Sequence, residues 1–591
     1  MIVFDWVLAI AAVVCTSLWA APIIARQLHI TDKAFFWSLS FGLSVGMLTL
    51  GLAVVGFILL SRVVVGVALV GLVGSALWFG EHIRLRNALG AAWDLLQSQT
   101  PATWGFGLAL LAVGIVVLAQ ATYYPFTGDD EISRYGYFAR LIYENQQLTA
   151  ETRGYPFLLP IAYAITFFAA DGLPEQAARL FPVLFSGMTV LATYALARRW
   201  LGSAAAWTAT LILAATPLFI FWAPVGYVDI PSALYMVLTT YAVDCWRESR
   251  SLRWAILTGF LAGLALWTKQ AGFAALAVLG LIVAATAVAE FRRVYPTRVL
   301  RVLGHGLLML CATLVGGGWW YIRNAIYDGW GAAVPGPGTF YTQQALNDLP
   351  HLLPFIAYFR DFGYLLAPVY ILGLTGACLA LVSNRLPRPL LQTLLWSIPY
   401  TLLWWWLFSY DPRFLLTVLP YYAIAAGGVL AKLWTFVHLH LSRSSATVLL
   451  TSAALMASGI GIWQARLGGA LLWLTEPTAS YGERLARAKG DLYPAVVYLH
   501  DHAQAEARIY SMDGRLNYYL LDRDVTIGYP DTTEQLAGYD FFVVGSWAQS
   551  VYRLLDWEDS DVLLELEGRA GFEEVFAGPT HSLIIYRMEN S

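Results

Sequence analysis

The feature that most restricts the fold of this chain is a series of apolar stretches, each about 20 residues long, that fills its first 465 residues. The hydrocarbon core of a bilayer is about 30 Å thick, and a helix needs roughly 20 apolar residues to cross it. We therefore predict a polytopic α-helical membrane protein with about 13 to 14 transmembrane helices. The predicted spans lie near residues 5–25, 35–60, 63–79, 103–121, 179–198, 204–223, 230–246, 253–268, 271–290, 302–321, 364–383, 391–408, 413–435 and 445–465.

The last 117 residues have a different composition from the rest of the chain. Charged side chains occupy 29 of the 117 positions after residue 474, but only 46 of the 474 positions before it. Soluble domains carry roughly 25% charged residues, so the tail has the composition of a soluble domain. Its excess of acids argues against a nucleic acid partner. Strand-like runs at 508–512, 540–545 and 581–588 and a helical run at 492–502 predict a small α/β domain.

These patterns predict three parts of the chain. Residues 1–102 form transmembrane helices that precede the core. Residues 103–470 form the transmembrane core, with external loops at 122–178 and 322–363, and residues 475–591 form the soluble domain. The four cysteines all lie in apolar stretches, which excludes a disulfide framework and a cysteine-based zinc site.

Basic residues indicate which ends of the predicted helices face the cytoplasm. They cluster at alternate ends, at 198–199, 247–253, 292–301, 385–388 and 432–443. Since cytoplasmic loops carry an excess of Lys and Arg, the opposite ends and the soluble domain are predicted to be extracytoplasmic. The apolar segment 155–171 would reverse every later loop if it crossed the membrane. We therefore predict that it lies along or dips into the outer face.

The most informative motif is a run of three acids, Asp129, Asp130 and Glu131, just after a predicted span. Closely spaced carboxylates at a membrane surface can accept a proton from a substrate or bind a divalent cation. Acids near a first helical turn also serve as ordinary helix caps. Spacing alone does not decide between these interpretations.

Four further motifs lie on the same predicted side of the membrane. They contain Tyr227 and Asp229 before Pro231, Lys269 within Trp267–Gln270, Tyr321 and Arg323 within Trp319–Asn324, and Arg413 beside Asp411. Each has a simpler explanation: Asp229 as a helix cap, Lys269 reaching lipid phosphate, the aromatic residues in a membrane-interface belt, and Arg413 paired with Asp411. Together, however, they place acids and cations on one face, as transfer from a lipid-linked phosphosugar requires. Acids would deprotonate an acceptor hydroxyl, and cations would stabilise a phosphate leaving group.

These motifs occur in the same order as in the glycosyltransferase C superfamily, and the chain therefore resembles that superfamily. Within it, the chain is most similar to dolichyl-phosphate-mannose protein mannosyltransferases and their bacterial relatives, including lipid A aminoarabinose transferases. The resemblance covers roughly residues 103–435 and rests on Asp130-Glu131, 155–160, 226–229, 267–269, 320–324 and 413–420. It implies an inverting glycosyltransferase of the cell membrane. Such an enzyme moves a sugar from a polyprenyl-monophosphate donor to an extracytoplasmic hydroxyl of a protein, lipid or glycan, and needs no metal cofactor.

The resemblance also implies roles for the site residues. Asp130 or Asp129 would be the base, with Glu131 beside it. Arg323, Lys269 and Arg413 would hold the departing phosphate. Asp229, Tyr227, Arg134 and Tyr321 would support the acceptor or the cations. The aminoarabinose transferases carry Lys-Pro-Pro where this chain has Arg153-Gly154-Tyr155-Pro156, so Arg153 would replace that lysine.

Three alternatives stay open from the sequence. A transporter or flippase of a lipid-linked glycan would also be polytopic, although transporters often show repeats and midplane charges that this chain lacks. A metal-dependent oligosaccharide transferase with a pyrophosphate donor is the second. A divalent cation held by Asp129, Asp130 and Glu131 is the third. The sugar and the acceptor cannot be derived from the sequence.

Overall fold

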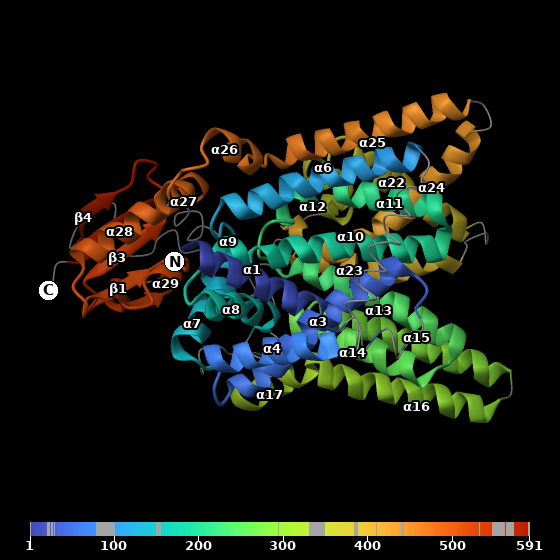
Figure 1. Cartoon of the computed structure of the whole chain (residues 1–591), viewed down its shortest axis with the longest axis horizontal. Coiled ribbons are helices and arrows are strands. Elements are labelled where there is room, and N and C mark those ends of the chain that lie inside the picture. Colours follow the sequence, from blue (N-terminus) through green and yellow to red (C-terminus); the bar gives the residue numbers. More distant parts are fainter. Residues whose placement is uncertain are drawn as a thin grey trace.

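The computed structural model describes most of the chain. The described residues are 2–20, 24, 28, 30–78, 101–148, 155–293, 295–329, 349–382, 388–408, 411–438, 442–530, 532–545, 562 and 572–588. Long helices run side by side along the longest axis of the molecule, and a small sheet domain lies at one end of this bundle (Figure 1). The fold class predicted from the sequence, a polytopic helical protein with a small C-terminal α/β part, is confirmed.

Each predicted span overlaps one helix or consecutive helices, while residues 21–23, 25, 79 and 383 of these spans lie outside the described residues. The long helices are α1 (Ile2–Leu18), α3 (Lys33–Gly56), α4 (Arg62–Trp78), α6 (Pro101–Tyr123), α10 (Leu180–Leu201), α11 (Ser203–Ala215), α13 (Asp229–Ser249), α14 (Leu252–Thr268), α15 (Gly272–Arg292), α16 (Pro296–Thr313), α22 (Leu366–Val382), α23 (Arg388–Phe408), α24 (Leu419–His438) and α25 (Arg443–Ala465). Among the described residues, six helical segments are long and apolar enough to cross a membrane, and seven further apolar helices are shorter. The chain is therefore a multi-pass membrane protein. The boundaries proposed above for its three parts remain predictions.

The apolar segment after residue 155 forms α8 (Leu158–Ala170), which is enclosed by protein. All of its residues except Ala169 are buried, and it packs against α1, α3, α4 and α7 (Tyr137–Asn145). A helix that is apolar on every side is stable only when every side is covered. The expectation that this segment lies along or dips into the outer face of the membrane stays a prediction; the 13 residues of α8 are too few for a candidate span, and the structure adds that neighbouring helices enclose it.

A kink at the end of α16 brings α17 (Trp319–Asp328) against α14. The kink is the short π-helix η3 (Leu314–Gly318), where a Cβ on Gly317 would lie 2.4 Å from the Gly263 carbonyl oxygen. Glycines at this crossing let the two backbones approach closely, as small residues do in membrane helix pairs. As a result, Trp320 of α17 packs against Trp267 near the end of α14.

The sheet domain contains five strands in the order β2-β1-β3-β5-β4. The strands are β1 (Arg508–Ser511), β2 (Asp524–Ile527), β3 (Phe541–Gly545), β4 (Phe572–Ala577) and β5 (Leu583–Met588). β1 pairs in parallel with β2 and β3, whereas β5 is antiparallel to β3 and β4. Helices α27 (Tyr481–Lys489) and α28 (Leu492–His502) precede the sheet. The runs expected at 508–512, 540–545, 581–588 and 492–502 correspond to β1, β3, β5 and α28.

Candidate active site

The three adjacent acids lie between α6 and α7, and their side chains point in three different directions. Asp129 and Asp130 form the entry to a π-helix, η1 (Glu131–Gly136), and Asp130 makes no capping hydrogen bond with its side chain. Because the backbone rotates by about 100° per residue in a helix, consecutive side chains cannot share one partner. The carboxylates therefore do not converge on a common point.

Glu131 is completely buried and braces the loop that precedes it. One carboxylate oxygen accepts hydrogen bonds from the N–H groups of Thr127 and Gly128 at 2.8 Å, and the other accepts from the Gly226 N–H at 2.7 Å. Gly226 has no room for a side chain, since a Cβ there would lie 2.6 Å from Glu131 Oε1 and 2.0 Å from the Tyr163 hydroxyl oxygen. These contacts give Glu131 a structural role beside the site.

A second buried ion, Arg179, completes this brace. Its Nε lies 3.4 Å from Glu131 Oε1, and its nitrogens donate to the carbonyls of Tyr124, Pro125 and Pro224 at 2.8 to 3.0 Å. Both charged side chains are 0% exposed. Removing one member of a buried pair leaves an uncompensated charge, so the pair strongly restrains the backbone on both sides of the acids.

The carboxylate of Asp130 contacts two cations. Its Oδ2 lies 3.3 Å from Arg413 Nη1, and its Oδ1 lies 3.5 Å from Arg134 Nε. The Asp130 N–H donates to the Tyr227 hydroxyl at 3.0 Å, and burial raises the pKa of Tyr227, so this hydroxyl stays protonated. The side chain of Asp130 remains 27% exposed. It is thus held by charge but open to a substrate.

Asp229 and Lys269 extend this charged cluster. Lys269 Nζ donates to Asp229 Oδ1 at 2.6 Å, and Arg413 Nε lies 3.7 Å from Asp229 Oδ2. The N-cap of α13 is Val228, and Asp229 lies in the first turn of this helix. Asp229 and Lys269 are each other's partner, which neither of the simpler explanations included.

Arg413 lies at the centre of the cluster. It also pairs with Asp411 at 3.2 Å, as the simpler interpretation of its motif proposed, and its guanidinium packs on the rings of Tyr227 and Phe414 at 4.3 and 4.9 Å. Asp411 caps the short helix η5 (Pro412–Thr417) by accepting from the Arg413 N–H at 2.9 Å. Burial raises the pKa of Asp411, and Arg413 offsets this only in part.

The cluster of Asp130, Asp229, Asp411, Arg134, Lys269 and Arg413 contains three acids and three cations. Its charges therefore balance without any added ion. We refer to these six residues as the charged cluster. A phosphate that enters would compete with the carboxylates for Arg413 and Lys269, the two cations held deepest. Arg413 supplies a planar fork that matches two phosphate oxygens, and Lys269 supplies a compact point charge.

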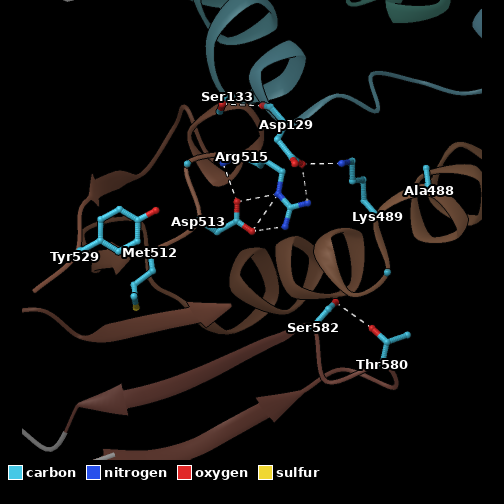
Figure 2. A pocket seen from close by; sticks show the side chains of 12 residues that line it. Asp129, Ser133, Ala488, Lys489, Met512, Asp513, Arg515, Tyr529, Thr580 and Ser582 are labelled. Carbon is cyan, nitrogen blue, oxygen red and sulfur yellow. Dashed lines mark hydrogen bonds and ion pairs between the residues drawn. The ribbon is translucent and has the colours of Figure 1, made fainter. Parts of the chain in front are cut away.

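Asp129 points away from this cluster, toward the sheet domain. Its Oδ1 lies 2.6 Å from Lys489 Nζ and 3.3 Å from Arg515 Nη1, as Figure 2 shows, and its side chain is 70% exposed. Partial burial favours the neutral acid, but Lys489 and Arg515 outweigh this and lower the pKa of Asp129 below its usual value. The two aspartates that the sequence could not separate thus have different environments.

Arg323 and Tyr321 lie on α17, beside the charged cluster. Arg323 contacts the Asn324 side chain at 2.9 Å, and its guanidinium packs on the rings of Phe57 and Trp320. The Tyr321 hydroxyl donates to the Leu266 carbonyl at 3.0 Å. Trp320 contacts Trp267, two residues before Lys269.

Two further predictions concern Arg153 and a bound metal ion. Arg153 is outside the described residues. Among the described residues, no group of three or more His, Cys, Asp or Glu side chains is arranged to hold a metal ion.

Sequence reasoning missed Arg179 and Glu175. Glu175 accepts from the hydroxyls of Tyr481 and Tyr518, both at 2.8 Å, and so joins the membrane part to the sheet domain. Arg179 is a cation at the start of the predicted span 179–198, on the side where basic residues are scarce, so the rule that identified Lys269 and Arg323 would have identified it too. That rule does not apply to Glu175, since acids are common on this side.

Comparisons with known proteins agree with this architecture. Residues 155–316 match the family model of dolichyl-phosphate-mannose-protein mannosyltransferases. No curated protein sequence matches the chain.

Three solved structures have a similar fold. ArnT from Cupriavidus metallidurans bound to undecaprenyl phosphate is 16% identical with a TM-score of 0.54, over 84% of this chain and 98% of ArnT. The same protein in the apo state gives 16% identity and a TM-score of 0.54, over 83% and 99%. The oligosaccharyltransferase AglB from Archaeoglobus fulgidus, in complex with an inhibitory peptide and a dolichol-phosphate, gives 14% and 0.49, over 83% of this chain and 74% of AglB.

Proposed function

We propose that the chain belongs to the glycosyltransferase C superfamily, whose fold it shares with ArnT, and that it is an inverting membrane glycosyltransferase. It moves a sugar from a polyprenyl-monophosphate donor to a hydroxyl of a protein, lipid or glycan acceptor. The reaction takes place on the extracytoplasmic side, where we also place the sheet domain. The donor class is supported by the similarity to ArnT, which was solved with undecaprenyl phosphate.

The observation that carries this proposal is the contact between Asp130 and Arg413. A partly exposed carboxylate lies 3.3 Å from a guanidinium that is itself close to Lys269 through Asp229. Transfer from a sugar phosphate needs a base for the acceptor and cations for the leaving group, close enough to act on one bond. The charged cluster supplies both kinds of group.

We propose the following chemistry. The acceptor oxygen attacks the anomeric carbon of the sugar, and its proton passes to a carboxylate oxygen of Asp130. The bond between the anomeric carbon and the phosphate oxygen breaks, and its electron pair leaves with the lipid phosphate. Arg413 and Lys269 stabilise the charge that develops on that phosphate. One displacement inverts the anomeric centre, whereas a retaining mechanism would need a second carboxylate as nucleophile.

Binding of the donor prepares Asp130 for this role. A phosphate held by the Arg413 fork would draw the guanidinium away from Asp130, which leaves the carboxylate free to accept a proton. Arg134 remains within 3.5 Å of Asp130 and would keep its orientation. Tyr227 fixes the backbone at Asp130, and Glu131 with Arg179 fixes the loop before it.

Arg323 and Tyr321 have a secondary part in this proposal. The guanidinium of Arg323 is packed on the aromatic rings of Phe57 and Trp320. In this proposal the donor lipid reaches Arg323 along these rings. We propose that these rings and Arg323 line the path of the lipid chain toward the charged cluster. No metal ion is part of the proposed mechanism.

The proposal is tested with purified full-length protein and a panel of polyprenyl-phosphate sugars, by measuring release of free polyprenyl phosphate and the anomeric configuration of the product. We expect release with at least one donor, inversion at the anomeric carbon, and no effect of a chelator. Loss of activity with the chelator would favour the metal-dependent oligosaccharide transferase. Movement of intact lipid-linked glycan across vesicles without release of polyprenyl phosphate would favour the transporter.

A further inference from the structure

A cavity of about 560 Å³ lies between the loop that carries Asp129 and the sheet domain. Figure 2 shows its lining, which comes from two parts of the chain that are far apart in sequence. Asp129 and Ser133 lie at and within η1, and Lys489, Arg515, Tyr529, Thr580 and Ser582 belong to the C-terminal part. Pockets that bind small molecules measure about 300 to 1,000 Å³, so this cavity is of suitable size.

The charged groups of this cavity are already paired with one another. Lys489 and Arg515 contact Asp129, and the Arg515 Nε also donates to Asp513 Oδ1 at 2.8 Å. The lining therefore holds two acids and two cations. An anionic ligand would have to break these pairs, and a neutral ligand would not.

The remaining polar groups of the lining are mostly hydroxyls. Ser133 donates to the Asp129 carbonyl, and Thr580 and Ser582 donate to the Asp491 carboxylate. A hydroxyl that donates in this way can still accept a hydrogen bond, although Ser582 already accepts one from the Asp491 N–H at 3.1 Å. The ring of Tyr529 is 41% exposed and offers an apolar face beside them.

This combination fits a sugar better than it fits a peptide or an anion. A sugar presents many O–H donors to hydroxyl and carboxylate acceptors, and its C–H face packs on aromatic rings. Lys489 also keeps donors for sugar oxygens, because an ammonium group has three N–H bonds and Asp129 accepts only one at 2.6 Å.

The cavity lies next to the proposed base. Asp129, in its wall, is the neighbour of Asp130, and consecutive Cα atoms are about 3.8 Å apart. A glycan that fills the cavity and presents its terminal hydroxyl to Asp130 therefore has to run past the Asp129 backbone.

We propose that this cavity binds a neutral glycan, and that the acceptor of the reaction is a hydroxyl of that glycan rather than of a protein or a lipid. The assignment of the acceptor rests on the proposed function. The binding of a glycan in the cavity can be measured without it.

The experiment measures binding of maltotetraose, cellotetraose and mannotetraose to the full-length protein in detergent by saturation-transfer NMR and calorimetry. We expect at least one tetrasaccharide to bind. Gly514→Phe, which fills the cavity, should weaken that binding at least tenfold, and Tyr529→Ala should weaken it about fivefold through loss of ring contact. Val497→Ala, at an exposed position on α28 outside the lining, is the matched control and should bind as the unmodified chain does.

Folding of the blocked variant is checked with Gly514→Ala. A Cβ at Gly514 would lie 3.5 Å from Ser133 Cβ and 3.8 Å from Ile527 Cγ2, which are ordinary contacts. Gly514→Ala should therefore unfold at the same temperature as the unmodified chain, and Gly514→Phe close to it.

These outcomes test glycan binding in the cavity separately from the proposed reaction. Glycan binding that Gly514→Phe abolishes supports the cavity assignment even if no donor in the panel is turned over, in which case only the proposed function fails. Absence of binding by all three tetrasaccharides, or binding that neither variant weakens, overturns the inference. Competition by serine- and threonine-containing peptides, or preference for a phosphorylated tetrasaccharide, overturns it as well.

Discussion

The ion pair between Lys269 and Asp229 allows a structural role to be separated from a role in catalysis. The two atoms are 2.6 Å apart, and their side chains are 13% and 2% exposed. Removing one partner of such a buried pair costs about 3 to 5 kcal/mol of unfolding free energy, because the other charge is left uncompensated. We expect Lys269→Met to cost about 3 kcal/mol, near the lower limit, since Arg413 stays 3.7 Å from Asp229.

The double variant Lys269→Met, Asp229→Asn should recover most of this stability. Replacing both members of a buried pair by neutral groups is often close to neutral. Arg413 keeps Asp130 and Asp411 as counter-ions in this variant. Because the double variant should then be destabilised less than either single variant, we expect the coupling between the two positions in a double-mutant cycle to exceed the cost of either single variant, measured by unfolding in mixed detergent micelles.

Activity should not follow stability in this cycle. If Lys269 stabilises the departing phosphate, its loss lowers the rate of polyprenyl phosphate release by about 10²- to 10³-fold in the single and in the double variant. A double variant that regains both stability and activity would show that Lys269 serves only as a counter-ion. That result would remove it from the proposed chemistry.

Four further results are expected. Arg413→Lys should retain folding but lose more than tenfold in activity, because the lysine cannot form the bidentate contact, whereas Arg323→Ala should raise the donor KM with little change in kcat. Glu131→Gln should lower the unfolding free energy by about 3 kcal/mol, because an amide nitrogen would then face backbone N–H donors; equal stability of the two proteins would contradict the bracing role. The pKa of Asp129 is lowered by Lys489 and Arg515. These two ion pairs therefore stabilise the contact with the sheet domain fully above the usual aspartate pKa of 3.8, and this stabilisation is lost as pH falls through the lowered pKa. Limited proteolysis of the sheet domain should therefore be constant from pH 8 to about pH 5 and should increase only in stronger acid.

The bundle could be predicted from the sequence because membrane spanning is a local property. A stretch of about 20 apolar residues has few alternatives in a bilayer, so the spans at 103–121 and 271–290 coincide closely with α6 and α15. The segment 155–171, which contains α8, is apolar in the same way. Whether an apolar helix crosses lipid or is enclosed by protein depends on its neighbours, which a single sequence does not reveal.

The charged cluster could be predicted only in part. A lysine between two apolar helices must meet an anion or the interface, and this argument led to Lys269 and, in structure, to Asp229. Arg179 binds mainly backbone carbonyls, which leave no pattern in the sequence. The different directions of Asp129 and Asp130 depend on a π-helical turn and on the sheet domain, both of which are tertiary features.

The most direct test of this account compares Asp130→Asn with Asp129→Asn in a single assay of polyprenyl phosphate release, with an active donor and acceptor. The two variants make the same chemical change at adjacent positions, one facing Arg413 and the other facing the sheet domain. The account predicts a loss of about 10²- to 10⁴-fold for Asp130→Asn, the range of general-base catalysis. It predicts less than a tenfold loss for Asp129→Asn, because exposed ion pairs contribute at most about 1 kcal/mol each. Full activity of Asp130→Asn, or a larger loss in Asp129→Asn, would contradict it.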